Sequence, residues 1–377
     1  MLKQLRQLRA RFTPTAADAN LPAGASTKFS LRELHRQNPN LARAFTWSTN
    51  PVLPLDQSPW LNLGCGEYFF DDFINVDLLP QVARVFAWNL LDIWPNEMVG
   101  KVAGVLCEDT LEHFFLNEQI CILCNINRAL QVGGVARILM PSLAKLIRYS
   151  TEYVPADEEL LHATFGVQTG ADALNMGMRF GGHRWLHDEE SLARLAVLCG
   201  FSSKITSCAQ STVPMLDKRN LRDETNSLSF AADLLKVHPL DLLPLVPSAV
   251  RGARVVESAG ADATLYMATS DRSTVEYVTK SPIPVDVLSC INIRSANLSS
   301  FDEHNLKTLV LDGRRRDKPW YFDETMKSRA CMNLANRHEV ATMLRGATQF
   351  SRLRFSPAAR EGQYFTLGGA ELFVRAV

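Results

Sequence analysis

The sequence predicts an α/β fold, with a Rossmann-like, doubly wound sheet that ends in an antiparallel hairpin and a separate C-terminal α/β module. Three observations support this prediction. Short apolar strands alternate with amphipathic helices from about residue 60 to 236, which is typical of a mainly parallel sheet with helices on both faces. A glycine turn, Gly64-Cys65-Gly66, follows the first strand. A proline-containing stretch then precedes a second group of strands that begins near residue 262.

Length and composition limit the classes of function. A chain of 377 residues accommodates two domains. Lys+Arg and Asp+Glu both number 40, so the formal net charge is zero, and the chain as a whole does not attract nucleic acid or anionic membranes. No stretch approaches the roughly 20 apolar residues of a membrane span. We expect no nucleic-acid partner, no transmembrane segment and a cytoplasmic location.

The first domain is expected to span residues 45–236, after an N-terminal arm at 1–44 and with a helical insertion at about 142–182. Its helices are predicted at Asn117–Leu130 and at Asp188–Cys199, where Asp188 is the N-cap and Gly200 follows the end. Its strands are predicted at Trp60–Leu63, Phe73–Val76, Val82–Ala87, Val102–Cys107, Val135–Met140, Phe201–Ser207 and Ser227–Asp233.

The C-terminal region is expected to form a compact α/β module at residues 262–377, after a linker at 237–261. The linker is suggested by Pro239, Pro244 and Pro247. A helix is predicted to begin near Glu339, and strands are predicted near Asp262–Thr269, Asp286–Ile293, Lys307–Leu311, Gln349–Phe355 and Ala370–Val377. The sequence indicates no role for this module.

The strongest local signal is the Gly-x-Gly turn together with the second strand, which ends on Asp77. A strand that leads into such a turn lets the backbone approach a ligand at the carboxyl edge of a parallel sheet. A dinucleotide fingerprint requires a third glycine where this chain has Phe69, and its acidic residue comes later than Asp77. A cofactor with a ribose but no pyrophosphate fits the pattern better.

Seven elements in this order resemble the class I S-adenosylmethionine-dependent methyltransferases, over roughly half the chain. Within that family, the resemblance is to a bacterial group associated with polysaccharide and cell-surface biosynthesis. The matching residues are Leu61–Gly66, Asn75–Asp77, Leu111-Glu112-His113, Gly133-Gly134, Pro141-Ser142-Leu143, Gly182-His183-Arg184-Trp185 with Asp188 and Ser191-Leu192, and Gly200-Phe201.

The resemblance implies a methyltransferase sheet that binds S-adenosyl-L-methionine at its carboxyl edge. The family usually contacts the adenine through an acidic residue after the third strand, but this chain has Asn89 there and Asp92 three residues later. The implied cofactor-binding residues are Gly64, Cys65 and Gly66 at the methionine part, Asp77 at the ribose, Asn89 or Asp92 at the adenine, and Asp109 near the sulfonium.

Two histidines are the candidate catalytic bases. His113 and His183 both follow motifs at the carboxyl edge of the sheet, and imidazole is the usual base for a hydroxyl acceptor. The alternatives are that His113 orders a helix start and that His183 packs over the cofactor. Asp109, Glu112 and His113 also have the ligand types of a Mg²⁺ site, but Leu-Glu-His recurs in metal-free members of the family, so no metal is expected.

These features predict a methyltransferase that acts on a small-molecule or glycan-related acceptor, more specifically at oxygen. One alternative keeps the cofactor-binding domain without catalysis, as a scaffold in a biosynthetic complex. A second alternative is a nucleotide-sugar or NAD enzyme, against which Phe69 argues. Neither the acceptor nor the oligomeric state follows from the sequence.

Overall fold

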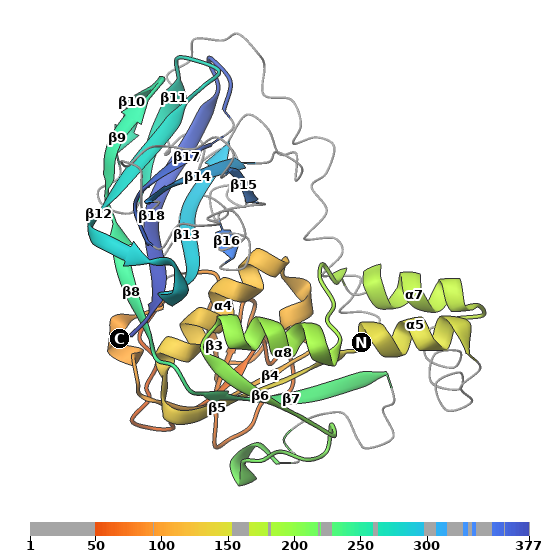
Figure 1. The fold of residues 1–377 in the computed structure, drawn as a ribbon. Helices are drawn as coiled ribbons and strands as arrows, with labels where there is room; N and C mark the ends of the chain where they lie inside the picture. The colour runs from red at the N-terminus through yellow and green to blue at the C-terminus, as the bar shows by residue number, and fades with distance from the viewer. Residues whose placement is uncertain are drawn as a thin grey trace. The chain divides into compact units, whose positions relative to one another are not determined.

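The computed structural model divides into two compact units, Asn50–Pro239 and Leu240–Val377 (Figure 1). Within these described residues, no helix is both long and apolar enough to cross a bilayer. The predicted arm at 1–44 lies outside the description. The structure describes residues 50–92, 94–152, 166–179, 182–217, 219, 228–258, 263–297, 307–314, 327–330, 334–336, 349–357 and 359–376.

The first unit is built on one seven-stranded sheet in the order β3-β2-β1-β4-β5-β7-β6. The five strands from β3 to β5 run parallel, and β7 runs antiparallel to both β5 and β6. This arrangement confirms the predicted Rossmann-like methyltransferase sheet with its terminal hairpin. The strands are β1 (Trp60–Leu63), β2 (Ile74–Asp77), β3 (Val85–Ala87), β4 (Val102–Glu108), β5 (Leu130–Pro141), β6 (Phe201–Thr206) and β7 (Ser229–Lys236).

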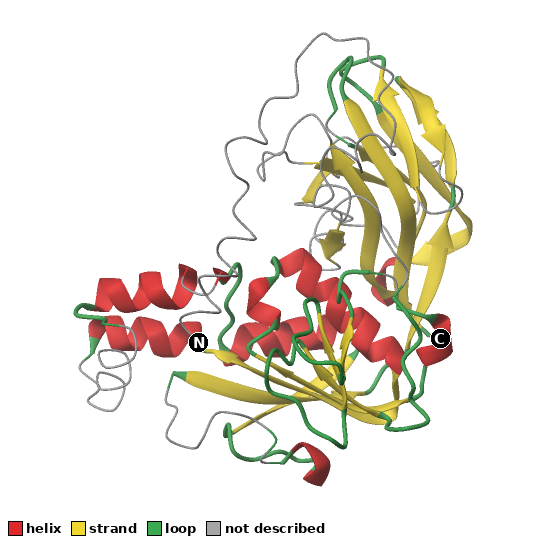
Figure 2. Cartoon of the chain, turned by 180° about the vertical axis from the view of Figure 1, so that it is seen from behind, coloured by secondary structure: helices red, strands yellow, loops and turns green. Residues whose placement is uncertain are grey.

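The two faces of this sheet are covered differently. Helices α4 (Leu116–Ala129) and α8 (Glu189–Leu198) lie on the same face (Figures 1 and 2). The side chains of Leu106 in β4 and Leu139 in β5 belong to a separate buried cluster. There they pack with Phe73, which precedes β2, and with Leu216, which follows β6. In the described part of the chain, the crossover at 64–73 between β1 and β2 contains no α-helix.

Short helices complete the first unit. Helix α8 begins as predicted, since the Asp188 carboxylate accepts a hydrogen bond of 2.7 Å from the Ser191 amide. The predicted helical insertion contains α5 (Leu143–Thr151) and α7 (Gly170–Arg179), while residues 153–165 between them lie outside the description. The 3₁₀ helices are η2 (Asn96–Met98), η3 (Leu111–His113) and η5 (Pro214–Leu216).

A buried ion pair joins β5 to β7. The guanidinium of Arg137 donates to the Asp233 carboxylate over 2.8 Å, and both side chains are at most 1% exposed. The same guanidinium donates to the Ser207 and Cys208 carbonyls, and the second carboxylate oxygen of Asp233 accepts from the Thr212 hydroxyl. Such a pair is tolerated in the interior because the terminal guanidinium nitrogens and both carboxylate oxygens donate or accept hydrogen bonds.

The second unit is a β-sandwich. Apolar side chains from both of its sheets share one core, including Tyr277 and Phe355 from the five-stranded sheet and Ile291, Phe365 and Leu372 from the six-stranded one. The five-stranded sheet has the order β15-β14-β17-β12-β9, and the other has β10-β11-β18-β13-β16 with β8 also paired to β18.

The strands of this unit are antiparallel throughout their described pairings. They are β8 (Leu240–Leu245), β9 (Pro247–Arg251), β10 (Ala253–Ser258), β11 (Ala263–Ala268), β12 (Thr274–Pro284), β13 (Leu288–Asn297), β14 (Lys307–Arg314), β15 (Lys327–Ala330), β16 (Leu334–Asn336), β17 (Gln349–Ser356) and β18 (Tyr364–Arg375), with η6 (Val285–Val287) before β13.

Two expectations for this region are corrected. The described residues of the C-terminal module are antiparallel strands and one 3₁₀ turn rather than α/β, and the helix predicted from Glu339 lies outside the description. The predicted linker at 237–261 contains β8, β9 and β10. The prolines suggested a linker because proline is excluded from central strands. Pro244 and Pro247 instead lie in strands that have one neighbour each among the described residues, where a missing amide donor is tolerated.

Candidate functional site

The turn after β1 has the backbone of a ligand-binding loop. Gly64 and Gly66 have φ values of 64° and 56°, in the left-handed region that favours glycine. A Cβ at Gly64 would collide with the Thr110 side chain, whereas a Cβ at Gly66 would meet no described atom within 4 Å. Gly64 is thus required for packing against the exit of β4, and Gly66 leaves open space beside the turn.

Asp77 closes this turn from the end of β2. Its carboxylate accepts a hydrogen bond of 3.0 Å from the Gly66 amide and one of 2.8 Å from the Leu79 amide. The side chain of Cys65 is buried, and burial together with the nearby Asp77 charge raises the pKa of the Cys65 thiol to about 12. The structure therefore places Gly64, Cys65, Gly66 and Asp77 together at the carboxyl edge.

Asn89 and Asp92 form a local turn after β3. The amide oxygen of Asn89 accepts from the Leu91 amide over 3.1 Å, and its amide nitrogen donates to the Asp92 carboxylate over 3.2 Å. The side chain of Asn50 bonds to the backbone of Asn89 on both its donor and its acceptor. These bonds give both candidate adenine contacts a structural role in the turn.

The chain leaves β4 through a constrained residue, Asp109. Its φ is 46°, the one positive value at a non-glycine residue of the described backbone, and such conformations cluster at functional sites. This turn directs Thr110 against the glycine loop, where its hydroxyl donates to the Glu108 carbonyl over 2.8 Å and lies 3.2 Å from the Leu63 carbonyl. The segment after β4 is thus packed directly onto the turn after β1.

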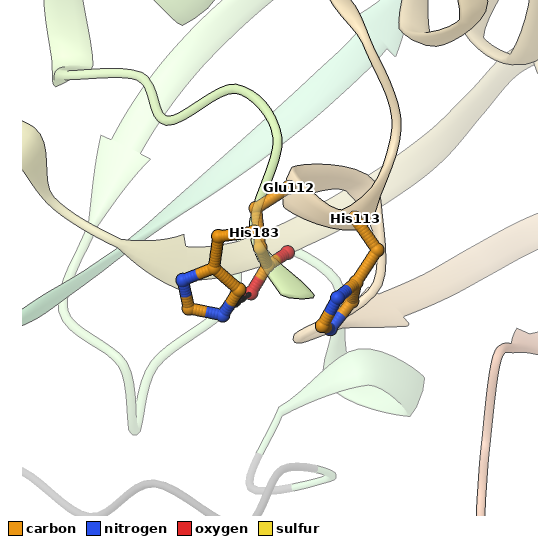
Figure 3. A group of neighbouring side chains, drawn as sticks. All are labelled: Glu112, His113 and His183. Carbon is orange, nitrogen blue, oxygen red and sulfur yellow. Dashed lines mark ion pairs between the residues drawn. The ribbon is translucent and has the colours of Figure 1, made fainter. Parts of the chain in front are cut away.

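Three chemically active side chains converge next to that segment. Glu112 and His113 belong to η3, while His183 comes from the loop before α8 (Figure 3). The ring centroids of His113 and His183 lie 5.1 Å apart, and Nε2 of His183 lies 3.9 Å from a carboxylate oxygen of Glu112. One ligand atom from each residue lies within 4.8 Å of the others.

Both histidines of this cluster are predicted site residues, whereas Glu112 is not. From the sequence, Glu112 is part of the matching Leu111-Glu112-His113 element and of the rejected metal pattern with Asp109 and His113, but it is not a predicted catalytic or cofactor-binding residue. The side chain is fully buried, at 0% exposure. Asp109 does not belong to the three-residue cluster found among the described residues, although its charge acts on His113.

Backbone hydrogen bonds fix the loop that carries His183. The amides of Arg184 and Trp185 donate to the Glu112 carbonyl over 2.8 and 3.2 Å. The Arg184 guanidinium also stacks 4.6 Å from the centre of the Phe115 ring. The loop is therefore attached to the same short segment that supplies Glu112 and His113.

A buried side-chain network supports this loop from behind. Gln119 of α4 donates from its amide nitrogen to the carbonyls of Trp185 and Phe114, over 3.1 and 3.0 Å. Its amide oxygen lies 2.8 Å from Nε2 of His187, whose Nδ1 lies 2.9 Å from the Ser191 hydroxyl. His187 is only 2% exposed, so it belongs to the buried interior behind the loop.

The protonation of the two site histidines is set by their surroundings. Nδ1 of His183 lies 2.5 Å from the Gly177 carbonyl. Since a carbonyl only accepts, Nδ1 carries the proton, and in the neutral ring the lone pair of Nε2 faces Glu112. Burial, and next the proximity of His183, lower the pKa of His113 to about 4. A neutral imidazole at this position can accept a proton or bind a cation.

Comparisons with known proteins give only distant likenesses. No family model matches the chain, and no curated protein matches it. A SAM-dependent methyltransferase from Archaeoglobus fulgidus shares 14% identity over 55% of this chain and 96% of its own, with a TM-score of 0.29. An O-methyltransferase family protein from Burkholderia thailandensis shares 14% identity over 47% of this chain and 50% of its own, with a TM-score of 0.29.

A third solved structure is of another kind. The low-affinity xylan-binding module CBM86 from Roseburia intestinalis shares 9% identity over 35% of this chain and 93% of its own, with a TM-score of 0.25. At these identities and TM-scores the likenesses bear on neither activity nor ligand.

Proposed function

We propose that the first unit is an S-adenosylmethionine-dependent methyltransferase. The observation that carries this proposal is the glycine turn after β1, hydrogen-bonded to the Asp77 carboxylate at the end of β2, in a sheet with the order β3-β2-β1-β4-β5-β7-β6. In open α/β sheets, ligands bind at the carboxyl ends of the strands where the order reverses, here next to β1.

The residues present fit the implied cofactor. The carboxylate of Asp77 lies at the edge with acceptor capacity for ribose hydroxyls, since each of its oxygens offers two acceptor positions. Open space beside Gly66 leaves room for a ligand next to the backbone. A dinucleotide fits less well because Phe69 occupies the position of the third glycine. When bound, S-adenosylmethionine supplies an activated methyl group on a sulfonium.

The acceptor that we propose is a hydroxyl of a small or glycan-related molecule. His113 and His183 support this choice because they follow β4 and precede α8, at the edge where the cofactor would present its methyl group. Their role would be to hold the hydroxyl and assist its deprotonation, which is worth roughly 10²–10⁴-fold in rate. Positioning of the two reactants contributes further.

Cofactor binding is the first test. Calorimetry of the full chain should show micromolar binding of S-adenosylhomocysteine and no binding of NADH. Asp77→Ala should weaken the binding of S-adenosylhomocysteine by about 1.5–3 kcal/mol, because charge-assisted hydrogen bonds to the ribose are lost. Asp71→Ala is the matched control, since its carboxylate is exposed and pairs with Arg84. Binding of NADH without S-adenosylhomocysteine would contradict the proposal.

Turnover is the second test, because binding alone does not distinguish an enzyme from a scaffold. The full chain should transfer a labelled methyl group from S-adenosylmethionine to hydroxyl acceptors in a panel of small molecules and oligosaccharides. Binding of S-adenosylhomocysteine without transfer to any member of such a panel would favour the non-catalytic alternative.

A further inference from the structure

The cluster of Glu112, His113 and His183 has a geometry that a free general base does not require. Two imidazoles and a carboxylate, two of them from η3 and the third from the loop before α8, place their ligand atoms within 4.8 Å of one another (Figure 3). We infer that Glu112, His113 and His183 bind one divalent first-row transition-metal ion. This departs from the expectation of no metal.

The distances are close to those of a coordination sphere. Bonds of about 2.0–2.2 Å from an ion to nitrogen and oxygen ligands place the ligand atoms roughly 3–3.5 Å apart. In the structure the separations are 3.9 Å between Glu112 and His183 and at most 4.8 Å within the cluster. An inward movement of about 1 Å, within the reach of side-chain rotations, brings the three atoms onto one ion.

The surroundings orient His183 as metal-binding histidines are usually oriented. Its Nδ1–H donates to the Gly177 carbonyl over 2.5 Å, which leaves Nε2 as the ligand atom on the side of Glu112. A ligating histidine almost always donates its other ring N–H to a carbonyl, carboxylate or water. The amides of Arg184 and Trp185 bond to the Glu112 carbonyl and hold the two ligand-bearing segments together.

Charge favours a cation at this position. The Glu112 carboxylate is fully buried, and buried charges are as a rule paired or bound to metals because desolvation is costly. Two neutral imidazoles add no charge, so a divalent ion leaves a net charge of +1. Three protein ligands also leave an open coordination position, as catalytic sites do.

The donor set selects the class of ion. Imidazole nitrogen suits zinc, iron and related transition metals, whereas Mg²⁺ and Ca²⁺ prefer oxygen ligands. The sequence pattern considered earlier paired Glu112 and His113 with Asp109 as a third, oxygen-bearing ligand for Mg²⁺. In the structure the third ligand is His183 instead of Asp109. Two imidazole nitrogens and one carboxylate bind a transition metal in preference to Mg²⁺.

The role of the ion rests on the proposed methyltransferase function. The open position would bind the acceptor hydroxyl, and the ion would lower the pKa of that hydroxyl, so that its proton leaves to water before methyl transfer. His113 and His183 would then act as metal ligands rather than as free bases. The inference that the cluster binds a metal rests on the positions of its ligand atoms and does not depend on the methyltransferase function.

The test is calorimetric titration of the full, metal-stripped chain with Zn²⁺, Mn²⁺ and Mg²⁺. We expect one site per chain that binds Zn²⁺ and Mn²⁺ at least tenfold more tightly than Mg²⁺. Glu112→Gln and His183→Ala should each weaken Zn²⁺ binding by well over tenfold. Loss of a hydrogen-bond partner behind a ligand already lowers metal affinity by about 10–100-fold. His238→Ala is the control, because it removes an exposed imidazole outside the cluster.

Unchanged Zn²⁺ affinity in Glu112→Gln and His183→Ala would overturn the inference, as would an absence of stoichiometric binding by the folded parent chain. The near-isosteric glutamine guards against loss of binding through misfolding, which circular dichroism of each variant checks. S-adenosylhomocysteine is titrated into the same samples. If it binds while Zn²⁺ does not, the metal site alone is refuted; in the reverse case, only the proposed function fails.

Discussion

Replacing His187 with glutamine should make the stability of the chain less sensitive to acid. His187 is buried between Gln119 and Ser191, and burial lowers its pKa from 6.5 to about 4. In the unfolded chain the imidazole titrates near 6.5. Between these two values the unfolded state binds more protons than the folded state, so stability falls as the pH decreases.

The magnitude follows from those two values. The complete contribution is about 3.5 kcal/mol, since each unit of pKa difference corresponds to about 1.4 kcal/mol. It is fully present above pH 6.5 and is lost as the pH falls toward 4. Between pH 7 and pH 5 the loss from His187 amounts to about 2 kcal/mol. His113, whose pKa is also lowered to about 4, contributes equally in the parent and the variant and cancels in their comparison.

Urea unfolding followed by tryptophan fluorescence measures this difference. Of the six tryptophans, four lie in the first unit, namely Trp60, Trp88, Trp94 and Trp185, so most of the signal comes from the unit that contains His187. We expect His187→Gln to be less stable than the parent at pH 7, because Gln119 and Ser191 lose well-placed partners. Its stability should fall by about 2 kcal/mol less than that of the parent between pH 7 and pH 5. An equal fall in both proteins would refute the argument that His187 is held neutral by burial.

Further predictions concern the sheet and the glycine turn. Arg137→Met should destabilise the first unit by about 3–5 kcal/mol, because it leaves the Asp233 carboxylate buried without its cation; urea unfolding measures this, and a loss below 1 kcal/mol would contradict it. Gly64→Ala should lower the melting temperature more than Gly66→Ala, because only the first Cβ collides with Thr110. Gly66→Ala should cost about 1–3 kcal/mol of backbone strain and also weaken S-adenosylhomocysteine in calorimetry; unchanged affinity would show that the ligand does not approach Gly66.

The sequence alone was sufficient for the core of the first unit. The strand Trp60–Leu63 and the helix begun by Asp188 lie where they were predicted, because a buried apolar run and a capped amphipathic helix are local patterns. The turn Gly64-Cys65-Gly66 and Asp77 were also expected at one edge, since consecutive parallel strands end on the same side. The backbone φ values and the hydrogen bond from Gly66 to Asp77 agree with that reading.

The C-terminal unit shows where local patterns are insufficient. Strands such as β17 and β18 were located approximately, but alternation within a strand does not specify its neighbours. Proline indicated a linker because its missing amide excludes it from central strands, and only the pairing of β8 and β9 showed that these strands lie at edges.

The sequence by itself located the strands of the first unit, the glycine turn and the acidic residue at the end of the second strand, since each is a local pattern of residue types. Only the tertiary structure decided that Glu112, His113 and His183 meet. The position of His183 depends on hydrogen bonds between segments distant in sequence, from Arg184 and Trp185 to the Glu112 carbonyl and from Gln119 to Trp185. Long-range contacts of this kind leave no periodicity or spacing in the chain, because they arise only when the packed helices and strands bring the two loops together.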